Sequence, residues 1–154
     1  MLILDKTLAI YYSRTGTTRR IAEQVASNTN ADIYEITLAE ALPNDMYAVA
    51  ELATNQYETN HLPALNKLPV IDHYDTILIG GPVWSGKLAT PIASLLQSVD
   101  FSNKNVAAFC TSTGSYAEYD SSFRQYCQTG NLFPGLYLGN SVNETRINQW
   151  VSQI

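Results

Sequence analysis

The sequence has little charge, and most of the charge that it has is negative. Charged residues make up 15% of the chain, with 14 acidic against 9 basic residues and a formal net charge of −5. Nucleic acids and anionic membranes attract basic surfaces, so this balance argues against both as general partners of the protein. A mildly acidic surface suits basic protein partners instead.

Long apolar runs are also missing. No stretch approaches the roughly 18 apolar residues that a membrane-spanning helix needs. Only a few apolar residues precede Asp5 and Lys6, which is too short for the apolar core of a secretion signal. We therefore expect a soluble, cytoplasmic protein with no membrane partner.

Cysteine and histidine are scarce as well. The two cysteines, Cys110 and Cys127, are spaced for neither a redox pair nor a zinc site, so we expect both to be reduced packing residues. His61 and His73 have no partner at metal-ligand spacing. With 154 residues and 45% hydrophobic content, the chain is predicted to form a single domain over residues 1–154 without a metal site.

The chain alternates five times between apolar runs and helix-like segments. The apolar runs cover 7–12, 33–36, 76–80, 106–110 and 132–138. The third and fourth runs lack polar alternation, which indicates strands covered on both faces. Each helix-like segment carries one apolar stripe. This order predicts an α/β fold, a doubly wound five-stranded parallel sheet with helices on both faces.

Two segments carry more detailed signals. Pro134 and Gly135 interrupt the fifth run, and because proline cannot donate to a ladder, that strand is predicted to lie at an edge. Ser141 and Glu144 have the spacing of a capping box, which predicts the start of the last helix. A short helix is expected from Asp45 to about residue 56.

Residues 13–18 lie between the first apolar run and the helix-like segment 19–26. A helix N-terminus presents free backbone N–H groups and the positive end of the helix dipole, and Gly16 lets the backbone approach a ligand closely. The segment adds four hydroxyls, from Ser13, Thr15, Thr17 and Thr18. Taken singly, each hydroxyl is equally consistent with an ordinary helix cap, but together they predict a phosphate site.

Two further loops follow the third and fourth strands. Residues 81–87 contain Trp84, and residues 111–116 are rich in small polar side chains and contain Tyr116. In an open α/β sheet, ligands bind beyond the carboxyl ends of the strands, where the strand order reverses. A phosphate loop, an indole and a polar loop at one edge suit a phosphorylated, planar aromatic ligand.

These motifs resemble those of flavodoxins. Ser13-x-Thr15-Gly16-x-Thr18 matches their phosphate loop, and Pro82-x-Trp84-x-Gly86 with Cys110-Thr-Ser-x-Gly114-Ser115 resembles the flavin-ring loops of a short-chain flavodoxin-like group. The resemblance spans nearly the whole chain and implies the strand order 2-1-3-4-5 and FMN as the cofactor. It assigns to the cofactor Ser13, Arg14, Thr15, Gly16, Thr17, Thr18, Pro82, Val83, Trp84, Ser85, Gly86, Thr111, Ser112, Thr113, Gly114, Ser115 and Tyr116.

The resemblance further implies that Trp84 lies against one face of the flavin ring, with Tyr116, or Tyr119 from outside this set, on the other face. The alternative for Trp84 is an anchor of its loop in the core, since an indole buries a large area. We hypothesise that the Ser85–Gly86 peptide turns toward flavin N5. Glu118 and Asp120 are interpreted as solvated charges at a helix entry rather than as groups that tune the flavin.

Other ligand classes fit less well. Residues 81–87 match the start of a nucleotide P-loop, but Leu88 replaces the Mg²⁺-binding hydroxyl residue and Pro82 supplies no N–H. Three functions remain. The first is an electron carrier between a reductase and an acceptor protein, with no catalytic side chain. The second is an NAD(P)H-dependent FMN oxidoreductase acting on quinone or nitro-type acceptors, although no Gly-x-Gly-x-x-Gly motif is present. The third is a module that senses flavin or another phosphorylated ligand.

Overall fold

The computed structural model describes residues 6–112, 118–139 and 141–154. The sheet is centred on β1 (Thr7–Tyr11), which pairs in parallel with β2 (Asp32–Glu35) on one side and β3 (Thr76–Trp84) on the other. Next to β3 lies β5 (Asn105–Thr111), also parallel. The main path runs β2-β1-β3-β5-β6, which confirms the predicted parallel order.

The edge strand is split in two. Instead of one strand over 132–138, the chain forms β6 (Asn131–Leu132) and β7 (Leu136–Leu138), each paired in parallel with β5. Pro134 lies between them and cannot donate to a ladder. Its carbonyl instead accepts a hydrogen bond of 2.8 Å from Trp150 Nε1. The predicted edge position is confirmed, and the single continuous strand is wrong.

A short hairpin that the sequence analysis did not predict extends β3. The strand β4 (Lys87–Leu88) pairs antiparallel with its end. The two residues of the turn, Ser85 and Gly86, have φ values of 53° and 80°. Two-residue hairpin turns of type I′ need positive φ at both positions, which glycine adopts without strain. Residues 81–87 are therefore strand and turn rather than a loop leading into a helix, which argues further against a nucleotide P-loop.

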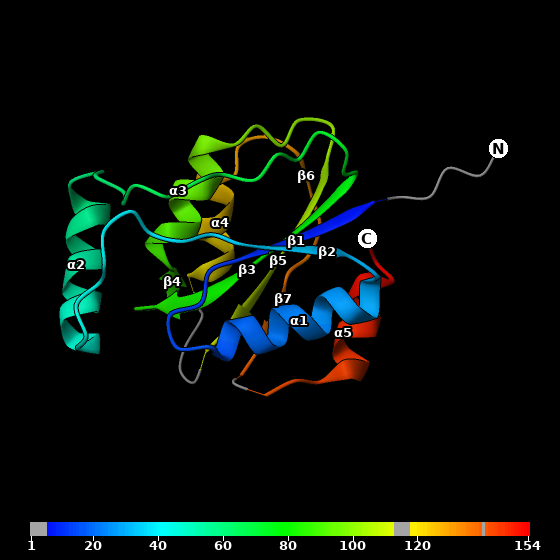
Figure 1. The fold of residues 1–154 in the computed structure, drawn as a ribbon, viewed down its shortest axis with the longest axis horizontal. Helices are drawn as coiled ribbons and strands as arrows, with labels where there is room; N and C mark the ends of the chain where they lie inside the picture. Colours follow the sequence, from blue (N-terminus) through cyan, green and yellow to red (C-terminus); the bar gives the residue numbers. More distant parts are fainter. Residues whose placement is uncertain (1–5, 113–117, 140) are drawn as a thin grey trace.

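The helices form two layers around the sheet (Figure 1). They are α1 (Thr17–Thr29), α2 (Met46–Glu58), α3 (Thr90–Ser98), α4 (Tyr119–Tyr126) and α5 (Glu144–Val151). In Figure 1, α1 and α5 cover one face, α3 and α4 cover the other, and α2 lies outermost beyond α3. The doubly wound arrangement predicted from the alternation is confirmed.

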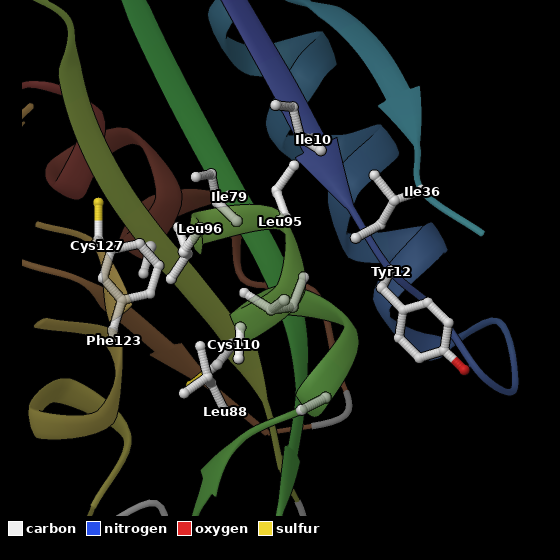
Figure 2. Packing of buried hydrophobic residues seen from close by; sticks show 14 of the residues in the cluster. Ile10, Tyr12, Ile36, Ile79, Leu88, Leu95, Leu96, Cys110, Phe123 and Cys127 are labelled. Atoms are coloured by element: carbon white, nitrogen blue, oxygen red, sulfur yellow. The ribbon is translucent and has the colours of Figure 1, made fainter. Parts of the chain in front are cut away.

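The side-chain alternation of β1 divides the core between these layers. Ala9 and Tyr11 pack with α1 and α5, while Leu8 and Ile10 pack with α3 and α4. Figure 2 shows the second cluster, in which Ile10 and its neighbours face the apolar side of α3. Burial of each large aliphatic side chain stabilises the fold by about 1.5–3 kcal/mol.

The helix starts test two sequence predictions. Asp45 precedes α2, and its carboxylate accepts a hydrogen bond of 3.3 Å from Tyr47 N–H, as expected for a helix that begins there. The capping box of Ser141 and Glu144 is wrong. Asn143 caps α5 and accepts a 3.0 Å hydrogen bond from Arg146 N–H. Glu144 is the first helical residue, where its side chain does not reach back over the cap.

Both cysteines are buried and free, as expected for packing residues. Burial raises the pKa of Cys110 to about 12 and that of Cys127 to about 11. His61 and His73 are exposed. Within the described part of the chain, no helix is both long enough and apolar enough to span a membrane.

Candidate flavin site

A cavity of about 510 Å³ lies beyond the carboxyl ends of β1, β3 and β5. It falls within the range of roughly 300–1,000 Å³ typical of small-molecule sites. Its walls come from the loop after β1, the end of β3 with its turn, the end of β5 and the first turn of α2. The lining residues are Ser13, Arg14, Thr15, Thr17, Thr18, Met46, Pro82, Val83, Trp84, Ser85, Gly86, Thr111 and Ser112.

The structure thus brings together most of the residues predicted from the sequence. Gly16 is not among the lining residues but connects two of them, Thr15 and Thr17. Thr113, Gly114, Ser115 and Tyr116 lie outside the described residues, so their predicted roles stay predictions. Met46 is a lining residue that the sequence analysis missed.

The loop after β1 is shaped by Gly16. This residue precedes α1 with φ at +97°, a left-handed conformation that glycine adopts most easily. Its N–H donates to Ser13 Oγ at 3.0 Å, which closes the turn. No side chain caps α1, and its first turn contains no acidic residue. The first N–H groups of α1 are therefore left to a ligand or to water, and the dipole there favours an anion.

Thr18 and Thr111 join two walls of the cavity. Their hydroxyl oxygens are 2.8 Å apart, and both residues are almost fully buried. This hydrogen bond connects the first turn of α1 with the end of β5, the strand that continues toward the third predicted loop. The Thr18 hydroxyl is therefore part of the frame of the site as well as of its lining.

Trp84 belongs to both the core and the cavity. It is only 4% exposed and meets Tyr12 edge-on, with ring centroids 5.9 Å apart and planes at 88°. This packing supports the interpretation of Trp84 as an anchor of its strand. Because Trp84 also lines the cavity, the anchored indole is a wall against which a ligand ring can lie.

Tyr119 is ruled out as the second ring partner. It is fully buried in the core, where its ring centroid lies 6.4 Å from that of Phe123 and 6.0 Å from that of Tyr137. Its hydroxyl has no hydrogen-bond partner among the described residues, and burial raises its pKa well above the usual value. The spacing of Tyr119 to the polar loop gave no sign of this burial, because α4 turns the ring inward.

The charges near the site agree with their interpretation as solvated groups. Glu118 Oε2 lies 3.6 Å from Lys87 Nζ, and Asp120 pairs with Arg124 at 3.0 Å on the exposed face of α4. The backbone N–H of Glu118 donates to the Gly86 carbonyl at 3.1 Å. This bond fixes the β3–β4 turn against the start of α4.

Arg14 connects the phosphate loop to the segment before α2. Its guanidinium donates to the Asn44 carbonyl at 2.8 Å. The contact lies two residues from Met46, which is 41% exposed and lines the cavity. The chain comes back to the cavity at Met46 because of this tertiary contact. No local pattern in the irregular segment 37–45 predicts it.

The comparisons with known proteins agree with this geometry. The profile of a family described as Flavodoxin matches residues 6–154. A flavoprotein from Lactobacillus acidophilus NCFM, solved in complex with FMN, is 30% identical with a TM-score of 0.80, covering 96% of this chain and 99% of that one. A candidate flavoprotein from Bacteroides uniformis ATCC 8492 is 30% identical with a TM-score of 0.84, covering 96% and 98%.

A more distant structure shares the fold. Oxidised flavodoxin 2 from Bacillus cereus is 17% identical with a TM-score of 0.59, covering 96% of each chain. No curated protein matches the sequence. Because the family profile extends over nearly the whole length, this chain belongs to the flavodoxin family.

Proposed function

We propose that this protein is an FMN-binding electron carrier. FMN is the cofactor indicated by the flavodoxin family, and the relative from Lactobacillus acidophilus was solved in complex with it. The observation that carries the proposal is the cavity itself, in which an uncapped helix N-terminus and a hydroxyl loop face the ends of β3 and β5. A phosphate and a ring joined by a flexible chain suit these two parts.

The residues of the cavity divide into two groups by their chemistry. Ser13, Thr15 and Thr17 supply hydroxyls, and the first turn of α1 supplies backbone N–H groups, for the phosphate. Residues 82–86 and Thr111 form the walls for the ring. When bound, FMN supplies electron uptake and release in single steps. The chain's own part is to hold the phosphate, orient the ring and limit the access of water.

The carrier function is favoured by what the cavity does not contain. Among its described lining residues, Arg14 is the only one with an ionisable charged side chain. Reduction of a quinone or a nitro compound needs protons at the acceptor, usually delivered by a positioned acid. Electron transfer between proteins needs no such group. The oxidoreductase remains the second candidate function.

The partners follow from the surface beside the cavity. We propose that a reductase and an acceptor protein dock in turn over the cavity mouth. Tyr47, which follows the lining residue Met46 in the sequence, is 87% exposed and offers apolar contact. The formal charge of −5 favours encounter with basic surfaces.

Anaerobic mixing of the FMN-loaded protein with NADPH separates the two functions. A carrier should lose its yellow colour slowly with NADPH alone and rapidly once a catalytic amount of a flavoprotein reductase is added. Rapid bleaching by NADPH alone, followed by turnover with a quinone, would instead establish the oxidoreductase. A protein that cannot be loaded with FMN at all would contradict both.

A further inference from the structure

The described part of the chain contains three sulfur atoms, and the residues that carry them differ in exposure. Cys110 and Cys127 are buried. Met46 is 41% exposed and lines the flavin cavity. The second methionine of the sequence, Met1, lies outside the described residues. Among the described residues, Met46 is therefore the sulfur-containing side chain that solvent reaches, and it lies at the candidate site.

The two thiols are protected from peroxides. A peroxide oxidises a cysteine through its thiolate, and thiols buried in apolar surroundings are inert. Burial raises the pKa of Cys110 to about 12 and that of Cys127 to about 11, so both thiols keep their protons near neutral pH. A thioether has no proton to lose, so its oxidation depends on access alone. Met46 has that access.

The backbone on either side of Met46 is fixed by hydrogen bonds. Before it, the Asn44 carbonyl accepts from the Arg14 guanidinium at 2.8 Å. The Asp45 carboxylate accepts from the Tyr47 N–H at 3.3 Å and caps α2, the outermost helix (Figure 1). Neither bond involves the Met46 side chain. A chemical change of this side chain therefore alters the lining of the cavity without removing the contacts that begin α2.

The thioether of Met46 suits contact with a flat aromatic ligand. Methionine is unbranched, flexible and polarizable, and its sulfur makes favourable contacts with aromatic rings. Oxidation to the sulfoxide makes the same side chain polar and chiral, which disrupts apolar interfaces that contain methionine. At the flavin cavity, the oxidised side chain exchanges an apolar contact with the ligand for contact with water.

We propose that Met46 is an oxidation site through which hydrogen peroxide weakens FMN binding, an inference that rests on the proposed FMN site. The Met46 sulfur attacks one peroxide oxygen, so that an S–O bond forms and the O–O bond breaks. The departing hydroxide takes the proton of the transferred oxygen and leaves as water. Sulfur loses two electrons and the peroxide gains them. Methionine sulfoxide reductases reverse this change.

The test begins with the flavin-free chain treated with hydrogen peroxide near neutral pH. Peptide mass spectrometry should find one added oxygen on Met46 and none on either cysteine. Titration with FMN, followed by flavin fluorescence, should then give a dissociation constant about tenfold higher than that of the untreated chain, the upper end of what one sulfur–aromatic contact contributes. Reductases for both sulfoxide epimers should restore the original affinity.

Two substitutions separate the oxidation of Met46 from other effects of peroxide. Met46→Leu keeps an apolar side chain of similar volume but has no sulfur. Because this variant keeps Met1 and both cysteines, peroxide treatment should change its FMN dissociation constant by less than about twofold. Met46→Gln introduces a polar side chain of similar length, and without peroxide it should bind FMN about tenfold more weakly than Met46→Leu.

Protection by the ligand gives a second readout. Small-molecule sites cover most of the surface of the ligand, so a flavin in the cavity covers the part of Met46 that faces it. Saturating FMN should therefore slow the oxidation of Met46 by at least about threefold. N-acetylmethionine in the same solution is the reference thioether, because its rate reports the peroxide that is present.

Four results would overturn the inference. If Met46 stays unoxidised while N-acetylmethionine reacts, peroxide does not reach it. If Met46 is oxidised and FMN affinity is unchanged, the side chain does not contact the bound flavin, and the proposed function stands. An equal loss of affinity in peroxide-treated Met46→Leu would assign the effect to another residue. An untreated chain that does not bind FMN would overturn the proposed function as well.

Discussion

At the scale of single residues, the site is built from hydroxyls that have different partners. Ser13 Oγ accepts from Gly16 N–H within its own loop, while the Thr18 hydroxyl is bonded to Thr111 across two elements. The first bond shapes the loop, and the second fixes the distance between α1 and β5. A hydroxyl in this cavity therefore contributes to the scaffold of the site and not only to ligand contacts.

The Thr18–Thr111 pair gives a prediction with its own control. Thr18→Val keeps the shape of the side chain but leaves the buried Thr111 hydroxyl without its partner, which costs about 1–3 kcal/mol of unfolding free energy. The double variant Thr18→Val/Thr111→Val removes both polar groups and should be less destabilised than Thr18→Val. Urea unfolding of the flavin-free chain measures Thr18→Val, Thr111→Val and the double variant, and a double variant that loses the sum of the two single losses would contradict the coupling.

At the scale of elements, local signals determined the helix starts and the sheet edge. Asp45 and Asn143 each begin a helix by accepting a backbone hydrogen bond. The break between β6 and β7 falls at Pro134, which no ladder accommodates and whose carbonyl is satisfied by Trp150. These features are set by one or two residues at a time.

The start of α5 can be tested by two alanine substitutions. Asn143→Ala removes the cap acceptor for Arg146 N–H and should lower the unfolding free energy by about 1 kcal/mol. Ser141→Ala should leave it unchanged, since Ser141 precedes the cap. Thermal unfolding of both variants decides between the observed cap and the capping box, which requires the larger loss from Ser141→Ala.

The same distinction explains how much the sequence could predict. The alternation of strands and helices, the edge position and the hydroxyl loop depend on patterns within short segments, so they were predictable, whereas the strand order followed only from the resemblance to flavodoxins. The burial of Tyr119 and the return of Met46 to the cavity depend on contacts between distant segments. The Arg14–Asn44 hydrogen bond that holds that return spans thirty positions of the chain. Ser85 and Gly86 are typical of a tight turn, but the neighbouring Trp84 favours the interpretation of the segment as a ligand-binding loop. The sequence analysis therefore did not predict the hairpin.

At the scale of the whole molecule, the two thiols make stability depend on pH. Burial raises the pKa of Cys110 to about 12 and that of Cys127 to about 11, while a free thiol ionises near about 8.5. At alkaline pH the unfolded chain therefore releases protons that the folded chain keeps. Their stabilising effect is fully present below about pH 8.5 and is lost as the pH rises toward 11 and 12.

We accordingly expect the unfolding free energy to be lower at pH 9.5 than at pH 8 by roughly 2.5 kcal/mol for the two thiols together, measured by urea unfolding with a reductant present. The double variant Cys110→Ala/Cys127→Ala should show a smaller decrease, because only the buried tyrosines remain to titrate. If the unfolding free energy of this variant decreases with pH as much as that of the unmodified chain, the thiols are not the cause of the pH dependence.

The most direct test of the central claim compares FMN with riboflavin, which has the same ring but lacks the phosphate. If the loop at residues 13–18 and the start of α1 bind the phosphate, the flavin-free chain should bind FMN at least about a hundredfold more tightly than riboflavin, the effect of two charge-assisted hydrogen bonds. Calorimetric titration of the same preparation with each flavin gives the ratio. Equal affinity for the two would contradict the assignment of the phosphate site and, with it, the flavodoxin-type function proposed for this protein.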